Sequence, residues 1–273
     1  MKPGMLDIEQ RDKGSLRQGY SRAVRRFEIA SIGAYALAMG WLLVLILPRF
    51  PANPWLALIA FMLGYVAADF VSGFVHWMAD TWGTPDWPVA GKALIRPFRE
   101  HHVDAKEITR HDFVETNGNN CFLSLFPTVS AALLPLESPA FFFTAVFLFS
   151  LSLWVFGTNQ FHKWAHMDAP PPFVAWLQRM SIVLPPDHHQ IHHTAPFAKY
   201  YCITVGWLNE PLHRLRFFQT LERIVSRLTG LVPREDDIGK GAALAMAALP
   251  RQPIELPRLE LPVGGQPPIP DPE

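Results

Sequence analysis

The chain of 273 residues has little cysteine and little charge. Its two cysteines, Cys121 and Cys202, are too few for a disulfide framework, an all-cysteine zinc site or an iron–sulfur cluster. Charged residues make up only 18% of the chain and hydrophobic residues 49%, a balance typical of a membrane protein with a polar headpiece. The formal net charge is zero, so the composition indicates no nucleic acid or other polyanionic partner.

Several catalytic motifs are also missing. The sequence has no Gly-x-Gly-x-x-Gly after a strand, no Walker loop, no Gly-x-Ser-x-Gly elbow and no His-Glu-x-x-His. Nucleotide, flavin and acyl-enzyme chemistry are therefore unsupported. If dioxygen is reduced by this protein, the electrons must come from a separate carrier protein.

Histidine is what the chain has in an unusual pattern. Eight of the eleven histidines fall in three tight stretches, and a fourth element pairs a histidine with a carboxylate at the same spacing. Residues three or four apart on a helix share a face, so each stretch can direct ligands at one point. The four elements are His76-x-x-x-Asp80, His101-His102, His162-x-x-x-His166 and the run from His188 through His189, His192 and His193.

The elements differ in how specific they are. The three imidazoles of His189, His192 and His193 are predicted to lie on one face of a helix that begins near Pro185-Pro186-Asp187. The adjacent pair His101-His102 is weaker alone, because neighbours on a helix diverge by about 100°.

Three histidines are ambiguous or set apart. His111 is either a ligand or a supporting group, and His188 either ligates or orients a neighbour. His213 is expected to be an ordinary surface residue.

The apolar segments predict the fold class, an all-α multi-pass membrane protein with about four transmembrane helices and a cytoplasmic helical cap. The spans are expected at about 29–48, 55–75, 122–136 and 140–157, the third being short enough to be tilted or re-entrant. Residues 1–28 are expected to form a cytoplasmic arm, residues 29–232 the membrane domain, and residues 233–273 a Pro-rich, disordered tail.

Basic residues predict the orientation. Lys and Arg are dense before residue 29, between residues 77 and 121 and after residue 157, so these segments are expected on the cytoplasmic side together with both termini and every histidine. The segment 214–228 alternates basic and apolar residues with helical period, and is expected either to lie on the inner leaflet or to pack on the headpiece. Asp69, within a span, is either a packing group or a site residue.

The ligand set limits the metal. Neutral imidazoles, alone or with one carboxylate, suit iron, zinc, copper or nickel, and exclude magnesium and calcium. A structural zinc needs only four ligands, so eight or more imply two metals. Two irons held by histidines at a membrane surface can activate dioxygen, and that position suits a substrate that cannot leave the bilayer.

Long strings of the sequence resemble the Kua-type membrane lipid desaturase family over about residues 68–229. The similar strings are ADFVSGFVHWMADTWGT, GKALIRPFREHHVDAKEITRHDFVETNGNNC, FGTNQFHKWAH, PPDHHQIHHTAPF and YYCITVGWLNEPL. The resemblance implies a multi-pass enzyme that uses dioxygen, a histidine-bound iron pair and an external electron carrier of the cytochrome b5 or ferredoxin type. The best-defined activity of the family forms the vinyl ether of plasmalogens from plasmanylethanolamine, and a plastid branch desaturates the acyl chain of phosphatidylglycerol.

The resemblance also implies a set of site residues. Metal ligands are expected at His76, His101, His102, His162, His166, His189, His192 and His193, with Asp80, His111 and His188 as catalytic groups beside them. The first element ends in Asp80 where ordinary acyl desaturases have a histidine, which leaves the ligand count open. His213 matches no motif.

The sequence therefore favours an oxygen-dependent, di-iron desaturase of membrane ether phospholipids, in a bacterial inner membrane or in the endoplasmic reticulum of a eukaryote. The phospholipid headgroup is expected near Lys92, Arg96, Arg99 and Arg110, although these basic residues equally suit ordinary positive-inside anchors. The alternatives are an acyl-lipid desaturase or hydroxylase with the same metal centre, a zinc-binding transporter or sensor, and a haem electron carrier.

Overall fold

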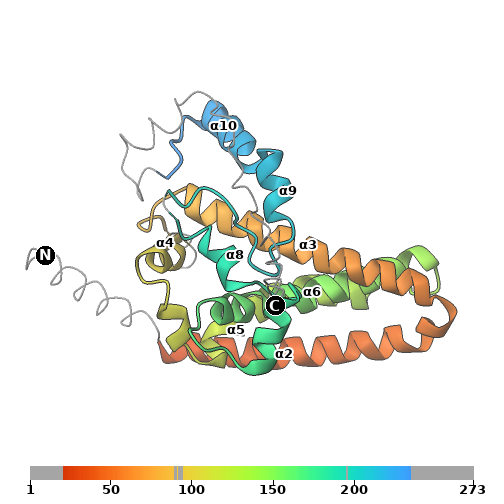
Figure 1. Cartoon of the computed structure of the whole chain (residues 1–273). Helices are drawn as coiled ribbons and strands as arrows, with labels where there is room; N and C mark the ends of the chain where they lie inside the picture. Colours follow the sequence, from red (N-terminus) through yellow and green to blue (C-terminus); the bar gives the residue numbers. More distant parts are fainter. Residues whose placement is uncertain (1–20, 89–90, 92–94, 195, 235–273) are drawn as a thin grey trace, which may run out of the picture.

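The structure is a computed structural model that describes residues 21–88, 91, 95–194 and 196–234. Among these residues every regular element is a helix, so the predicted all-α class is confirmed. Four long helices run side by side as a bundle, and the short helices gather at one end of it (Figure 1).

The bundle consists of α2 (Arg22–Ile46), α3 (Pro54–Thr81), α5 (Phe113–Ala132) and α6 (Pro139–Ala165). A 3₁₀ turn, η2 (Leu47–Ala52), joins α2 to α3. The end that carries the short helices, here called the head, is built from α4 (Arg96–Val103), η4 (Glu107–Arg110), α7 (Pro172–Arg179), α8 (Pro186–Gln190), α9 (Asn209–Arg214) and α10 (Phe217–Thr229).

Local sequence explains where the long helices begin. The Ser21 side chain accepts the Val24 amide, and the Asp112 carboxylate accepts the amides of Val114 and Glu115, so both residues cap the free N–H groups of a first turn. Helices α3 and α6 begin with Pro54 and Pro139, whose missing N–H and fixed φ suit the first helical position.

Within the bundle, α6 lies between α3 and α5, and α5 also packs along α2. The contact of α3 with α6 is close because Gly64 has no side chain. A Cβ at Gly64 would lie 2.5 Å from the Phe147 carbonyl oxygen and 2.6 Å from the Ser150 Cβ. The Ser150 hydroxyl donates across the same contact to the Phe61 carbonyl oxygen at 2.6 Å.

Within the part of the chain that the structure describes, three segments are long and apolar enough to cross a membrane: Arg22–Ala52, Pro54–Thr81 and Pro139–Ala165. Many of their large apolar side chains face outward, such as Leu37, Trp41 and Trp55, as expected for helices surrounded by lipid. Helix α5 falls outside this set, so a fourth span stays a prediction.

The helix ends differ from the expected segments, because polar residues extend the helices at the head. Helix α2 begins at Arg22, inside the expected polar arm, and α3 and α6 run on to Thr81 and Ala165. These extensions carry His76, Asp80 and His162 as parts of continuous bundle helices. Of the expected tail, only Pro233 and Arg234 lie within the described residues.

Candidate metal centre

Five histidines from three parts of the chain converge where the bundle meets the head. His101 comes from α4, His162 from α6, His166 follows α6, and His189 and His193 come from α8 and the turn after it. One ring nitrogen of each lies within 4.8 Å of those of the others. This set is called the five-histidine group.

The distances within this group suit ligands of a single ion. The Nε2 atom of His189 lies 2.8 Å from that of His162, 2.9 Å from that of His166 and 3.0 Å from that of His193. Ligand nitrogens about 2.0–2.1 Å from a metal, at angles of about 90–110°, are about 2.8–3.4 Å apart. One ring nitrogen can make only one hydrogen bond, so three neighbours at this distance are better explained by lone pairs that converge on a cation.

A second group lies beside the first. It consists of His76 and Asp80 from α3, His102 from α4 and His192, which follows α8, and is called the Asp80 group. The Nε2 atoms of His76, His192 and His102 lie 3.2, 3.4 and 3.5 Å from Asp80 Oδ2. Rings of the two groups come close, with centroids of His76 and His162 6.0 Å apart.

The Asp80 group also has the donor set of a metal site. Both carboxylate oxygens of Asp80 are buried without a hydrogen-bond partner, as is His76 Nε2. Buried polar atoms without partners destabilise a fold, and a bound cation would satisfy all three. Three imidazoles and one carboxylate suit iron, zinc or another transition metal. The residues present therefore fit the two metals that the sequence predicts.

Two backbone carbonyls orient imidazoles of the Asp80 group. His76 Nδ1 lies 3.0 Å from the Tyr201 carbonyl oxygen, and His192 Nδ1 lies 2.9 Å from the Lys199 carbonyl oxygen. A carbonyl only accepts, so each Nδ1 carries the proton and donates it. This tautomer leaves Nε2 of both rings unprotonated and directed at Asp80, as a ligand must be.

Asp69 holds the segment that carries these carbonyls. This fully buried residue of α3 accepts the amides of Val205 and Gly206 at Oδ1, at 2.9 and 2.8 Å, and the amide of Leu208 at Oδ2, at 3.0 Å. Of the two expectations for Asp69, the packing role is the one that these contacts support. No sequence pattern marks the carbonyls of Lys199 and Tyr201, because every residue has a carbonyl.

Burial keeps the imidazoles of the five-histidine group neutral. Loss of solvent, and then the neighbouring imidazoles, hold the pKa values of His101 and His189 well below their usual range. Burial lowers the pKa of His166 to about 4. At neutral pH these rings are therefore uncharged, which is the state that binds a metal.

The imidazoles of His189, His192 and His193 lie close together, as expected for one helical face, with ring centroids 4.6–5.7 Å apart, but the regular helix is shorter than the run. Helix α8 ends at Gln190, and the amides of His192 and His193 both bond to the His189 carbonyl oxygen in a tightened turn. His189 and His193 consequently belong to the five-histidine group, whereas His192 belongs to the Asp80 group. The adjacent His101 and His102 divide between the groups in the same way, as their divergence on a helix requires.

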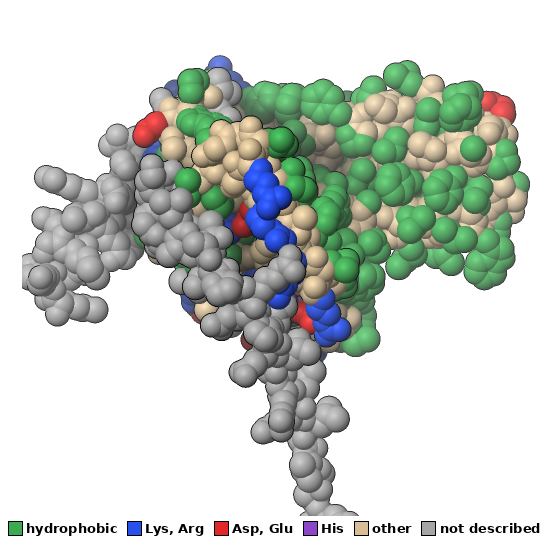
Figure 2. All heavy atoms as spheres, turned by 90° about the horizontal axis from the view of Figure 1, so that it is seen from above, with side chains coloured by type: hydrophobic (Ala, Val, Ile, Leu, Met, Phe, Trp, Pro, Cys, Tyr) green, Lys and Arg blue, Asp and Glu red, His purple; other side chains and the backbone are tan. Residues whose placement is uncertain are grey.

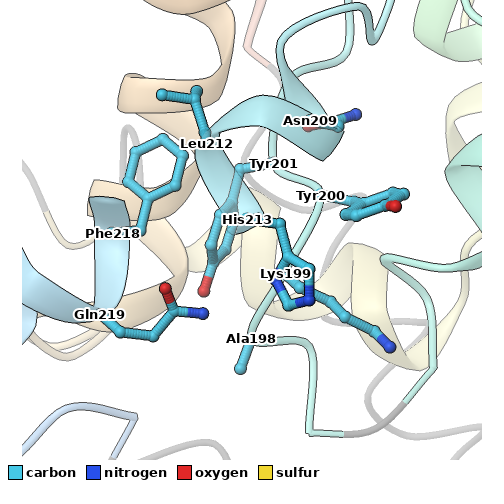
Figure 3. Close-up of a pocket in the computed structure, with 9 residues that line it drawn as sticks. All are labelled: Ala198, Lys199, Tyr200, Tyr201, Asn209, Leu212, His213, Phe218 and Gln219. Carbon is cyan, nitrogen blue, oxygen red and sulfur yellow. The ribbon is translucent and has the colours of Figure 1, made fainter. Parts of the chain in front are cut away.

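Three histidines lie outside both groups. His111 is close to Glu115, with 3.7 Å between His111 Nε2 and Glu115 Oε1. The His188 ring lies against the Tyr200 ring in a tilted contact with centroids 4.9 Å apart, and His213, partly buried, lines a small pocket with Tyr200 and Tyr201 (Figure 3). The catalytic roles expected for His111 and His188 stay predictions.

Three of the four basic residues expected at the headgroup have protein partners. Arg96 bonds to Glu100, Arg110 bonds to Asp104 Oδ2 at 2.6 Å, and the buried Arg99 donates to the Asp80 carbonyl oxygen. Arg99 thus supports the backbone of a candidate ligand. Lys92 lies outside the described residues.

An open apolar groove of about 490 Å³ runs along α6. Its α6 residues recur at positions 153, 157, 160 and 164, which place them on the face of the helix opposite to His162. The groove therefore does not lead directly to the metal groups. It is lined by Phe113, Leu153, Trp154, Phe156, Gly157, Gln160, Phe161 and Trp164.

These features define a class: a helical membrane protein with two adjacent histidine-rich groups, able to hold metal ions, at one end of its bundle. Comparison with known families gives a match to the lipid desaturase domain over residues 65–236. This range includes every member of both groups. The chain belongs to the lipid desaturase family, and it is accordingly an oxidoreductase that acts on membrane lipids.

Individual curated relatives within this family are similar to the chain to different degrees. The chain is 58% identical over 240 residues to a plasmanylethanolamine desaturase of Myxococcus xanthus, covering 88% of this chain and 85% of the relative. It is 46% identical over 201 residues to plasmanylethanolamine desaturase 1 of Mus musculus, covering 71% and 74%. It is 34% identical over 178 residues to the chloroplastic fatty acid desaturase 4 of Arabidopsis thaliana, covering 63% and 52%. No solved structure matches the chain.

The family membership confirms the resemblance found in the sequence, and it favours a desaturase over a zinc transporter or a haem electron carrier. The identity of the metals and the ligand role of each histidine stay predictions.

Proposed function

We propose that the protein converts the 1-O-alkyl chain of plasmanylethanolamine to the vinyl ether of plasmalogens. The observation that carries this proposal is the pair of adjacent ligand groups at the end of membrane-spanning helices, in a chain 58% identical to a relative with that activity in its name. The reaction removes one hydrogen from the carbon next to the ether oxygen and one from the neighbouring carbon. Dioxygen takes up these hydrogens together with two further electrons and protons, and becomes two water molecules.

The two groups are proposed to hold one iron each. His101, His162, His166, His189 and His193 would hold one ion, and His76, Asp80, His102 and His192 the other. Bound iron would supply the oxidising power, drawn from dioxygen, that is needed to break an unactivated C–H bond; acid–base side chains alone cannot do this. The near absence of cysteine is consistent with iron held by nitrogen and oxygen.

The protein's own residues perform three tasks in this proposal. The carbonyls of Lys199 and Tyr201 fix the rings of His192 and His76, so that the ligand nitrogens are in place before any metal arrives. Burial excludes bulk water from the Asp80 group, since His76, Asp80 and His192 are fully buried. Asp80 supplies the only negative charge of either group, which offsets part of the charge of the cations.

The substrate assignment rests on the two ether-lipid relatives. The lower identity to the chloroplastic relative makes acyl-lipid desaturation the second candidate. The phosphate of the phospholipid is proposed to lie near Arg96, Arg99 and Arg110, which follow α3 at the head, and near Lys92.

Four spans, with the head and both termini in the cytoplasm, complete the proposal. The cytoplasmic side also gives access to an electron carrier of the cytochrome b5 or ferredoxin type. Residues 29–232 would form the membrane domain in either a bacterial inner membrane or the endoplasmic reticulum. Reporter fusions at Met1 and after Pro233 should both report the cytoplasmic side, and an external signal from either would contradict this orientation.

The chemistry is tested by lipid analysis. Cells that make ether lipids but no plasmalogens should accumulate acid-labile vinyl ethers when they express the wild-type protein. His192→Ala and His189→Ala should each abolish this product, because each removes a ligand from one group. His213→Ala is the matched control, since His213 lies outside both groups, and it should keep near-normal activity.

Metal analysis of the same proteins tests the metal centre independently of the catalytic activity. The wild type should contain two irons per chain, and either histidine variant should lose iron while still inserting into the membrane. A new acyl double bond without vinyl ether would favour the second candidate. A single zinc without iron, or equal damage from His213→Ala and His192→Ala, would contradict the proposed centre.

A further inference from the structure

Helix α10 has an apolar face that the rest of the protein covers only in part. Phe218 and Glu222 are buried against the bundle, where Phe218 packs on Trp77 and Tyr201. Ile224 and Leu228, about a quarter of a turn or more away around the helix, are 46% and 81% exposed. The apolar face of α10 is therefore wider than its protein contact.

Exposed apolar residues continue on both sides of the helix. Leu215, two residues before α10, is 75% exposed, and Leu231, two residues after it, is 41% exposed. If this edge of α10 and the segments before and after it faced water, the four large apolar side chains of Leu215, Ile224, Leu228 and Leu231 would be solvated. Large exposed apolar side chains grouped on one element are typical of a surface that meets another apolar phase.

Basic side chains border this edge. Arg223 and Arg227 are exposed on α10 and have no carboxylate within salt-bridge distance among the described residues, while Arg214 on α9 is paired with Glu210. The acidic residue of α10, Glu222, is buried and bound to Arg234, with 2.8 Å between Arg234 Nη2 and Glu222 Oε2. The exposed surface of α10 is thus positively charged next to its apolar edge.

The position of α10 relative to the bundle indicates which environment its exposed apolar edge contacts. Helices α9 and α10 lie beside α3 at the head, at the opposite end of the bundle from the loop between α2 and α3 (Figure 1). From above, Lys and Arg side chains form a row at the border between the apolar body of the bundle and the head (Figure 2). If the long helices span a bilayer, this border is where the lipid headgroups would begin.

We propose that α10 lies in the membrane interface at the head, with Ile224 and Leu228 among the upper acyl chains and Arg223 and Arg227 on anionic headgroups. An amphipathic helix with a cationic border binds such a surface through both burial and charge. Glu222 and Arg234 fix the opposite side of the helix to α3, since Arg234 also donates to Thr81 Oγ1 at 3.1 Å. The surface is independent of the lipid that the enzyme desaturates.

Environment-sensitive labels test this placement in the full-length protein. The native Cys121 and Cys202 are buried, so a single introduced cysteine can be labelled selectively. Leu228→Cys reports the apolar edge, and Ser226→Cys is the matched control, about 200° away on the same turn. Both labelled proteins are placed in nanodiscs of phosphatidylcholine with or without phosphatidylglycerol.

The label at position 228 should emit at shorter wavelength and be quenched by acyl-chain-brominated lipid, whereas the label at 226 should be quenched by aqueous iodide. Adding Arg223→Gln and Arg227→Gln to the Leu228→Cys protein should weaken lipid quenching in anionic discs and leave it unchanged in neutral discs.

Three results would overturn the proposal. Equal iodide quenching at both positions would place the helix in water. Shielding of position 228 from both quenchers would mean that another part of the chain, such as residues 235–273, covers it. Identical behaviour in neutral and anionic discs, with and without the two arginines, would remove the role of charge.

Discussion

The carboxylate of Asp69 offers the sharpest test of how the candidate centre is held. It accepts three backbone amides from residues 205–208, and the preceding residues Lys199 and Tyr201 present the carbonyls that orient His192 and His76. Asp69→Asn keeps one acceptor oxygen, which can still serve Val205 and Gly206. The new amide NH₂ then faces the Leu208 N–H, and one buried donor is left without a partner.

The expected magnitudes follow from the number of donors left unsatisfied. One orphaned buried amide costs about 1–3 kcal/mol, so Asp69→Asn should lower the free energy of unfolding by about that amount. Asp69→Ala orphans three amides and should cost roughly 3–9 kcal/mol, a large part of the stability of a typical domain. Ser31→Ala is the control, because the buried Ser31 hydroxyl bonds only within its own helix, to Phe27.

The assay combines thermal unfolding of the purified protein in detergent with metal content. Asp69→Asn should unfold at a lower temperature and lose metal from the Asp80 group before the five-histidine group, because only the former depends on the carbonyls of Lys199 and Tyr201. Wild-type unfolding and metal content in Asp69→Ala would refute this reasoning. If that variant were also inactive, Asp69 would be a residue of the reaction instead of an anchor.

Three further outcomes are expected. Gly64→Ala should disrupt the contact of α3 with α6, because its Cβ would clash with backbone and side-chain atoms at 2.5–2.9 Å. Gly40→Ala is the control, since a Cβ at Gly40 meets open space. The two variants are compared by the yield of folded protein after detergent extraction, and equal yields would contradict the packing. Arg234→Ala should cost about 3–5 kcal/mol in denaturant unfolding, since it leaves Glu222 as an unpaired buried charge, while Lys106→Ala, in an exposed pair with Asp168, should cost less than about 1 kcal/mol. Chelation should lower the unfolding temperature, and readdition of iron should restore it. Bound metal should raise the free energy of unfolding by about 2.7–4.1 kcal/mol at free metal 100–1,000 times the dissociation constant. An unfolding temperature that chelation leaves unchanged would mean that the groups hold no metal.

The sequence predicted the helical membrane architecture because its signals are local. Apolar runs of span length are read directly, and the spacing of His76 with Asp80 and of His162 with His166 places each pair on one helix face. The sequence could not predict how the candidate ligands divide between the five-histidine group and the Asp80 group. The division of His189, His192 and His193 depends on where α8 ends, and that end depends on a turn whose geometry the sequence pattern does not specify.

The sequence also could not predict contacts between residues far apart in the chain. Arg234 was expected at the start of a tail without structure, yet its guanidinium is buried between α3 and α10, where it contacts Thr81, Tyr201 and Glu222. No periodicity or motif marks a single arginine for such a role. The pairing of Asp69 with residues more than 130 positions away is invisible for the same reason.

Helix α3 continues without a break from a membrane-spanning segment to His76 and Asp80, and α6 does the same up to His162. The height of the candidate centre above the hydrocarbon is consequently fixed by the register of these two helices in the bilayer. On the proposed function, a phospholipid held by its headgroup would present only the carbons at that height, which lie close to the glycerol. Regioselectivity would then be set by vertical position, and moving the bundle by one helical turn would redirect oxidation to a different carbon of the chain.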